Sequence, residues 1–145
     1  MSQDQNSSKI VAEALSWVGT PYHYGQCQKG VGVDCARFAL IPYKVAGIIP
    51  DGATLPAQHS DWILGKKVNR YAFRDYILRW ADEVPYDTRQ PGDLVTFIVG
   101  GVESHCGILV TKDDIVHAVS NSCVRQQRLM KVGSLKAVYR AKNGQ

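Results

Sequence analysis

The chain has 145 residues, 45% of them hydrophobic, and a formal net charge of +4. Its length predicts one domain over residues 1–145, and its hydrophobic content excludes a wholly disordered chain. No stretch approaches the roughly 18 apolar residues of a membrane span. The small net charge does not by itself indicate a nucleic-acid partner, so neither a membrane span nor nucleic-acid binding is expected.

The basic residues are concentrated towards the C-terminus. No acidic residue follows Asp114, whereas six basic residues do: Arg125, Arg128, Lys131, Lys136, Arg140 and Lys142. This distribution fits either an ordinary solvated surface or a face towards an anionic polymer or partner protein.

The N-terminal segment Met1–Lys9 is polar and lacks the apolar stretch of a signal peptide. We therefore expect synthesis in the cytoplasm without export by that route, with residues 1–8 frayed. The four cysteines show no metal-ligand spacing, so free thiols and no metal are expected. They are Cys27, Cys35, Cys106 and Cys123.

The first half of the chain predicts two helices joined by a loop. Lys9–Val18 has apolar residues at helical spacing, and Thr20–Val33 is a loop rich in glycine and proline. Asp34 is a suitable N-cap for a buried helix over Cys35–Val45. Pro42 is expected to kink or shorten that helix, and Gly47 to end it.

The second half predicts a loop over Ile48–Lys67, an amphipathic helix over Asn69–Val84, and then consecutive strands. The five predicted strands are Leu94–Val99, Cys106–Thr111, Ile115–Val119, Val124–Leu129 and Leu135–Arg140. Helices followed by strands that succeed one another directly predict an α+β domain with an antiparallel sheet.

Cys35 is the candidate nucleophile because it follows Asp34 at the predicted start of a helix. The free N–H groups and partial positive charge of a helix start stabilise a thiolate, which is the attacking form of cysteine. The same amides can donate to an oxyanion. The alternative is a small buried core residue, as most free cysteines are.

His105 and His117 lie in strand-like segments and are candidate bases, since an unperturbed imidazole has a pKa of about 6.5. Strand alternation places His105 and Gly107 on one face and Cys106 in the core behind them, with Gly107 leaving room for a helix start. If the two strands are neighbours, His117 can hold the tautomer of His105. The alternatives are an exposed strand-end histidine and a hydrogen-bonded core histidine.

Five short segments occur in order along the chain: Trp17-Val18-Gly19-Thr20-Pro21-Tyr22, Gly32-Val33-Asp34-Cys35, Pro91-Gly92-Asp93-Leu94, Ser104-His105-Cys106-Gly107-Ile108 and Ile115-Val116-His117-Ala118. With them, the chain from about Ala12 to Arg140 resembles the NlpC/P60 family of bacterial cell-wall cysteine peptidases. The resemblance implies a papain-like α+β fold, in which N-terminal helices pack on an antiparallel sheet of five to six strands.

The resemblance also implies hydrolysis of peptidoglycan stem peptides without a cofactor, commonly between D-γ-glutamyl and diaminopimelate. Cys35 would be the nucleophile, His105 the base and His117 the orienting residue. Tyr22 would donate towards the oxyanion and Asp34 would meet the substrate's amino group. The alternatives are a packed loop aromatic for Tyr22 and a plain N-cap for Asp34.

The family commonly has Ser-Gly after the cysteine, whereas this chain has Ala36-Arg37. Arg37 adds a cation that can favour the thiolate or bind a substrate carboxylate. Cys27 is interpreted as a neutral loop residue, with a redox role towards Cys35 as the alternative.

The segments Thr20–His23 and Lys29–Cys35 look most like the branch of this family encoded in tailed-phage and prophage tail modules. That branch implies incorporation into a virion tail, with tail-hub or tail-tip proteins as partners and peptidoglycan stem peptides as substrate. Three alternatives stay open. They are a catalytically silent or partner-gated docking component of the tail tip, a zinc site built from Cys35, His105, His117 and another cysteine, and a toxin delivered by a contractile apparatus.

Overall fold

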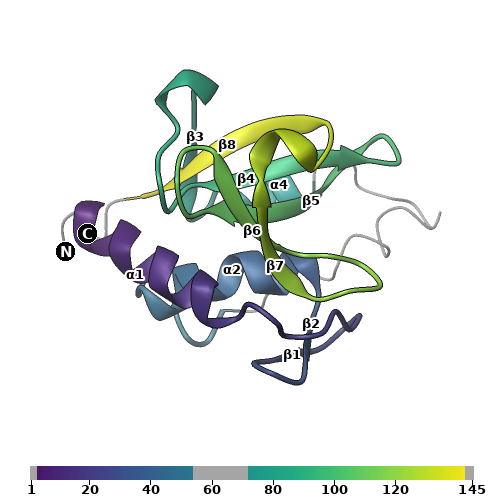
Figure 1. The fold of residues 1–145 in the computed structure, drawn as a ribbon. Coiled ribbons are helices and arrows are strands. Elements are labelled where there is room, and N and C mark those ends of the chain that lie inside the picture. Colours follow the sequence, from purple (N-terminus) through teal and green to yellow (C-terminus); the bar gives the residue numbers. More distant parts are fainter. Residues whose placement is uncertain (1–2, 54–71, 143–145) are drawn as a thin grey trace.

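The computed structural model describes residues 3–53 and 72–142. Its α-helices are α1 (Gln3–Ser16), α2 (Cys35–Val45) and α4 (Ala72–Ile77), and its strands are β1 (Cys27–Gln28), β2 (Gly32–Val33), β3 (Ala81–Val84), β4 (Leu94–Val99), β5 (Val102–Leu109), β6 (Asp114–Ala118), β7 (Val124–Arg128) and β8 (Leu135–Ala141). Strands β3 to β8 form a six-stranded antiparallel sheet in the order β3-β8-β4-β5-β6-β7, while β1 and β2 pair separately. The predicted α+β fold is confirmed (Figure 1).

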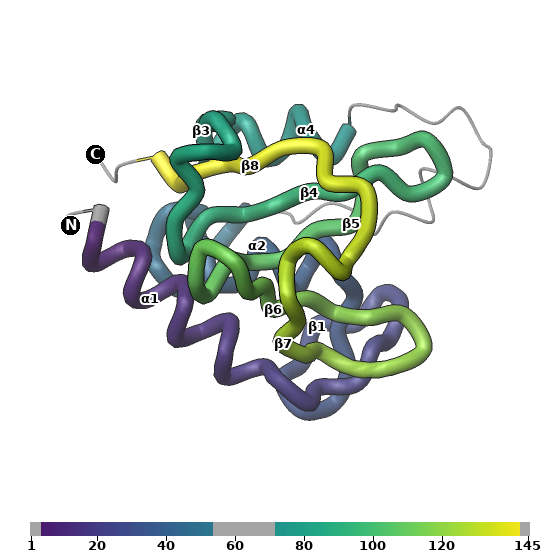
Figure 2. The backbone as a smooth tube through the Cα atoms, turned by 45° about the horizontal axis from the view of Figure 1, so that its top comes forward, coloured from purple at the N-terminus to yellow at the C-terminus, as the bar shows by residue number. Residues whose placement is uncertain are grey.

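The helices α1 and α2 pack on each other and on one face of the sheet, where α2 contacts β5 and β6 (Figure 2). The larger core lies between them and includes Phe38 of α2 together with Ile108 and Val116 of the sheet. A smaller apolar cluster that includes Val95 and Phe97 covers the other face. Within residues 3–53 and 72–142, no helix is long and apolar enough to cross a membrane.

Helix α1 begins at Gln3, so the prediction that residues 1–8 are frayed and that the helix starts at Lys9 is wrong for residues 3–8. Tertiary contacts stabilise this first part of the helix. Asn6 is buried, and a Cβ atom on Gly92 would come within 3.0 Å of the Ser7 Cα atom. The prediction failed because the segment is polar, whereas Ser7 lies against a turn that is distant in sequence.

Helix α2 has the predicted bounds. The Asp34 side chain caps it by accepting from the backbone N–H of Arg37. The helix continues through Pro42, which does not shorten it. Gly47 has a φ of 82°, and its N–H donates to the Lys44 carbonyl at 3.0 Å, so the predicted end at this glycine is confirmed.

The helix predicted over Asn69–Val84 is only partly present. Residues 69–71 lie outside the described residues, as do residues 54–67 of the predicted loop Ile48–Lys67. Helix α4 ends at Ile77, and Ala81–Val84 forms β3, which pairs with β8. The backbone of this segment hydrogen-bonds to a strand about 55 positions later, and such pairing overrides helical spacing.

The predicted strand Leu94–Val99 is confirmed. The strand predicted over Ile115–Val119 is shifted by one residue at both ends, and the last two predicted strands differ from the structure by one residue at their C-terminal end. Strand β5 begins at Val102, four residues earlier than predicted. Its pairing with β4 contains a bulge, since Phe97 pairs with His105 but Ile98 pairs with Glu103. The bulge places Glu103 and His105 on opposite faces of the sheet, although they are two residues apart.

Arg140 of β8 and Asp93, which precedes β4, form a two-bonded ion pair. The Arg140 Nε and Nη2 atoms lie 3.0 Å and 2.9 Å from the two carboxylate oxygens, and Asp93 is only 1% exposed. The pair therefore joins two neighbouring strands at a point where the carboxylate has almost no access to water.

We expect Arg140→Met to lower the free energy of unfolding by about 3 kcal/mol, because it leaves the Asp93 carboxylate buried without its partner. Urea unfolding measures the loss. The control is Arg128→Met, whose partner Asp114 lies 3.5 Å away and whose side chain is 62% exposed. That variant should lose less than about 1 kcal/mol. Equal losses in the two variants would contradict this account of the buried pair.

Candidate active site

Cys35 lies in the first turn of α2 and has no exposed surface. The Cys106 thiol donates to the Cys35 carbonyl at 3.3 Å, and the Tyr22 hydroxyl is hydrogen-bonded to the Cys35 side chain. Cys106 is a core residue, as predicted, but strand alternation did not reveal that it packs directly under Cys35. The structure thus collects Cys35, Tyr22 and Cys106 at the start of one helix.

Tyr22 is held at this helix start by its backbone. It forms a bridge with Val33, and its N–H donates to the Ser122 carbonyl at 2.9 Å. Burial raises the pKa of the Tyr22 hydroxyl, and the charges of Cys35 and Asp34 raise it further. The phenol therefore keeps its proton at neutral pH and remains a hydrogen-bond donor.

Asp34 is fully buried and accepts three hydrogen bonds. Its donors are the backbone N–H groups of Gly25 at 3.1 Å and Arg37 at 3.0 Å, and the Arg37 guanidinium at 2.6 Å. Burial raises the pKa of the carboxyl group, and the bonds and charge of Arg37 oppose that rise. Arg37 thus neutralises Asp34, a role that sequence reasoning did not anticipate. The preceding Ala36 is buried in the core.

His105 and His117 lie on neighbouring strands and touch each other. The His105 Nε2 atom is 2.8 Å from the His117 Nδ1 atom, and the two rings meet edge to face with centroids 5.1 Å apart. The Phe97 ring lies against His105, with its centroid 5.7 Å away. The hairpin-neighbour prediction for these two strands is confirmed, since β5 and β6 pair antiparallel.

Gly107 lies opposite His117 in this pairing. A Cβ atom on Gly107 would come within 2.7 Å of the Val116 carbonyl oxygen and 2.8 Å of the His117 Cβ atom. The close approach at Gly107 is therefore that of strand β6, and the prediction that Gly107 leaves room for a helix start stays a prediction. Gly107 shares the face of His105, and on that face its close neighbour is the adjacent strand.

His117 is 4% exposed, and its second ring nitrogen also has a partner: Nε2 lies 2.8 Å from the Gln127 Oε1 atom. Burial lowers the pKa of His117 to about 4, although the hydrogen bond to Gln127 opposes this shift. His117 is therefore neutral at neutral pH. Sequence reasoning missed Gln127, because only the register of β6 and β7 brings it beside His117.

The start of α2 lies against the strands that carry the histidine pair. Cys106, whose thiol donates to the Cys35 carbonyl, is the chain neighbour of His105, and α2 packs on β5 and β6. The candidate site is built from these three elements. Within residues 3–53 and 72–142, no group of three or more His, Cys, Asp or Glu side chains is arranged to hold a metal ion.

Cys27 lies on β1, where it pairs with Val33 of β2. It is exposed, and its neighbouring charges are those of Asp34, Arg37 and Lys44. All four cysteines are free thiols. The thiol that contacts Cys35 is that of Cys106. The alternative redox role of Cys27 towards Cys35 therefore has no structural support.

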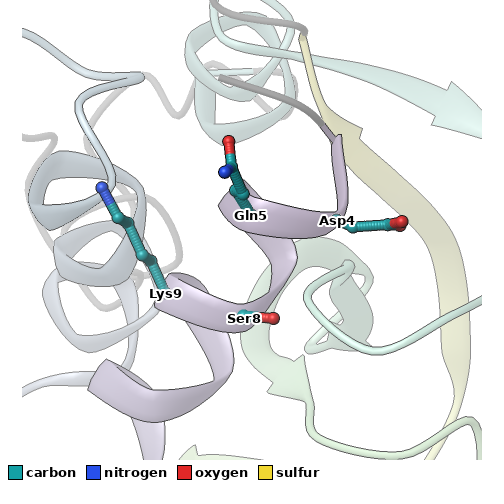
Figure 3. A pocket seen from close by; sticks show the side chains of 4 residues that line it. All are labelled: Asp4, Gln5, Ser8 and Lys9. Carbon is teal, nitrogen blue, oxygen red and sulfur yellow. The ribbon is translucent and has the colours of Figure 1, made fainter.

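A surface pocket lies elsewhere, on the N-terminal turns of α1. Its described lining residues are Asp4, Gln5, Ser8 and Lys9 (Figure 3). None of the six predicted site residues is among them. The pocket is therefore separate from the site at the start of α2.

We expect Gly107→Ala to destabilise the protein by about 2 kcal/mol, because the added methyl group meets the backbone of β6. Chemical denaturation measures the effect. Gly52→Ala is the matched control, since a Cβ atom there meets nothing within 4 Å. An alanine at position 107 that is tolerated as well as one at position 52 would refute the close approach of β5 and β6.

The pKa of His117 predicts a pH dependence of stability. An ordinary histidine takes up its proton near pH 6.5, whereas folded His117 does so only at about pH 4. Its contribution is therefore fully present above about pH 6.5 and is lost as the pH falls towards 4, a change on the order of 3 kcal/mol. Urea unfolding at both ends of this range should show a smaller acid loss in His117→Gln than in the wild type. The same acid loss in both proteins would contradict the shift.

Comparisons with known proteins identify the family of the chain. The sequence profile of the NlpC/P60 family matches residues 19–143. No curated protein sequence matches the chain. Among solved structures, the NlpC/P60 domain of the peptidoglycan hydrolase SagA is 20% identical with a TM-score of 0.65, over 94% of this chain and 98% of that one.

Two longer proteins share the fold. An NLP/P60 family protein similar to a lipoprotein from Staphylococcus aureus is 21% identical with a TM-score of 0.66, and the match covers 97% of this chain but 43% of that one. The peptidoglycan hydrolase RipB from Mycobacterium tuberculosis is 19% identical with a TM-score of 0.61, over 95% of this chain and 65% of that one. The profile match over most of the chain shows that this protein belongs to the NlpC/P60 family.

Proposed function

We propose that this protein is a cysteine peptidase that hydrolyses peptidoglycan stem peptides. The observation that carries the proposal is the placement of Cys35, at a helix start, in one site with the hydrogen-bonded pair His105 and His117. Membership of the NlpC/P60 family supports it, as does the fold shared with SagA and RipB, both of which are described as peptidoglycan hydrolases.

The groups of the site fit a two-step acyl transfer. His105 takes the proton of the Cys35 thiol, and the sulfur attacks the scissile carbonyl carbon. Helix-start amides and the Tyr22 hydroxyl donate to the oxyanion that forms. His105 then gives the proton to the amine that leaves as the C–N bond breaks. Water, deprotonated by His105, attacks the thioester; the C–S bond breaks, the carboxylate is released, and the proton returns from His105 to the Cys35 sulfur. His117 orients the His105 ring throughout.

We propose the bond between D-γ-glutamyl and diaminopimelate as the one cleaved. The resemblance to the family supports this choice. The Asp34 carboxylate can attract a substrate amino group only weakly, because Arg37 neutralises it. The Arg37 side chain is 24% exposed, so the same guanidinium can pair with a substrate carboxylate, of which diaminopimelate peptides carry several.

We further propose that the protein is made in the bacterial cytoplasm and incorporated in a virion tail, with tail-hub or tail-tip proteins as partners. The support for this setting is the resemblance of the segments Thr20–His23 and Lys29–Cys35 to tail-encoded members of the family. The basic C-terminal third offers charge for such a partner or for the anionic wall.

A partner-gated enzyme is the second candidate, and one observation favours it. Cys35 has no exposed surface, although Tyr22, which is hydrogen-bonded to it, and His105 are partly exposed. A substrate therefore reaches the sulfur only after neighbouring side chains move. Docking onto a tail partner is one way to produce that movement.

The test is digestion of purified sacculi, with mass spectrometry of the released fragments. Wild type should release fragments with new amino termini at diaminopimelate, and Cys35→Ala should lower the rate about a thousandfold or more by removing the nucleophile. Cys27→Ala is the matched control and should cleave like the wild type, because Cys27 is an exposed thiol with no part in the proposed acyl transfer.

Two other outcomes change the account. A folded Cys35→Ala variant with undiminished activity would overturn the proposed nucleophile. If wild type cleaves only after tail proteins are added, the enzyme is partner-gated.

A further inference from the structure

We infer that Gln127 is a positioning residue that decides which nitrogen atom of His117, and through it of His105, carries the proton. The inference rests on the proposed peptidase function for its catalytic meaning. Its structural content, a fixed pair of tautomers, holds independently of the substrate and can be measured without one.

The sheet register brings Gln127 to His117. In the β6–β7 pairing, His117 is opposite Arg125 and Ile115 is opposite Gln127, so Gln127 is the diagonal neighbour of His117 on the same face. The two side chains use this proximity, since the Gln127 Oε1 atom lies 2.8 Å from the His117 Nε2 atom. His117 is thus held between Gln127 on one strand and His105 on the other.

The proton positions follow from which atoms can donate. An amide oxygen only accepts hydrogen bonds, so the Nε2 atom of His117 must carry the proton. The Nδ1 atom of neutral His117 is then a bare acceptor, and His105 donates to it from Nε2 across 2.8 Å. In neutral His105 this leaves Nδ1 with its lone pair, free to take the proton of the Cys35 thiol.

The opposite amide orientation would reverse every step. If the Gln127 NH2 group faced the ring, it would donate to the Nε2 atom of His117, and His117 would carry its proton on Nδ1. That proton would point at the Nε2 atom of His105, whose own proton would then sit on Nδ1. His105 could no longer act as the base towards Cys35, so the orientation of one amide selects the active tautomers.

The hydrogen-bonded chain from Gln127 through His117 to His105 requires a neutral His117. An imidazolium ring donates from both nitrogen atoms and cannot accept from His105. The groups that act on His117 are His105 from β5, Arg125 and Gln127 from β7, and Cys35 from α2. Burial holds the pKa of His117 at about 4, and the Arg125 cation pushes it in the same direction. The His117 ring is therefore neutral at the neutral pH at which this hydrogen-bonded chain would act.

The direct test uses nitrogen chemical shifts of the imidazole rings in protein labelled with 15N-histidine. We expect both His117 and His105 of the wild type to be Nε2–H tautomers near neutral pH. In Gln127→Leu, His117 should lose its fixed tautomer, because nothing accepts from Nε2. An Nδ1–H tautomer of His117 in the wild type, or unchanged tautomers in Gln127→Leu, would overturn the inference.

Kinetics on muropeptides test the catalytic consequence. We expect Gln127→Leu to lower kcat about tenfold with little change in KM, the effect of one lost hydrogen bond. Gln127→Glu keeps an acceptor at this position and should restore most of kcat above about pH 7. Its carboxylate should also raise the pKa of His117 and so move the acid limb of the pH–rate profile upwards.

Gln126→Leu is the matched control, since Gln126 is exposed on the same strand and pairs with Val116 instead of flanking His117. It should leave both the tautomers and kcat unchanged. If Gln127→Glu is as impaired as Gln127→Leu, with an unshifted acid limb, a positioning role is refuted. If wild type cleaves no muropeptide, either alone or with tail proteins added, while the tautomers are as expected, the proposed function fails and the inference about Gln127 stands.

Discussion

The packing of the start of α2 against strands β5 and β6 is the constraint on which the site depends. The contact between the Cys106 thiol and the Cys35 carbonyl fixes the helix on one side of β5. On the other side, Gly107 lets the backbone of β6 come close, which brings His117 to His105. The bulge between β4 and β5 places His105 on one face of the sheet and Glu103 on the opposite face, towards the core. The arrangement of Cys35, His105 and His117 therefore depends on these three features.

The site is built from groups whose charges are suppressed or paired. Burial keeps His117 neutral and Tyr22 protonated, and Arg37 neutralises Asp34. Such groups act as fixed dipoles and hydrogen-bond donors in surroundings that exclude water, where each interaction is stronger than in bulk solvent. We therefore expect the oriented hydrogen bonds, more than any net charge in the site, to determine the reactivity of Cys35.

The local features of the fold could be predicted from the sequence where the cause was local. Asp34 and Gly47 bound α2 because a carboxylate caps a helix start and glycine adopts a positive φ at a helix end. The segment Ala81–Val84 was wrongly assigned to a helix because its strand partner lies far along the chain. The first turns of α1 were missed for the same reason, since their contacts are with the turn at Gly92.

In the candidate site, too, local features could be predicted from the sequence and distant contacts could not. Motif order predicted Cys35, His105 and His117 as candidate site residues, a prediction of roles that the structure leaves untested, and alternation correctly placed Cys106 in the core. Alternation alone did not show that Cys106 supports Cys35, that Arg37 neutralises Asp34, or that Gln127 holds His117. These relations depend on the docking of a helix onto a sheet, on a side-chain rotamer and on strand register, respectively, and a one-residue change of register would remove Gln127 from His117.

The measurement that tests the central claim most directly is the rate at which iodoacetamide labels Cys35 and Cys27 in the folded wild type and in His105→Ala, read by peptide mass spectrometry. The thiolate is the reactive form of cysteine, so a base that takes the thiol proton speeds labelling. The account predicts that Cys35 is labelled in the folded wild type and more slowly in His105→Ala, while Cys27 is labelled at the same rate in both proteins. Labelling of Cys35 only after unfolding, or at a rate that His105→Ala leaves unchanged, would contradict the assignment of Cys35 as the nucleophile and His105 as its base.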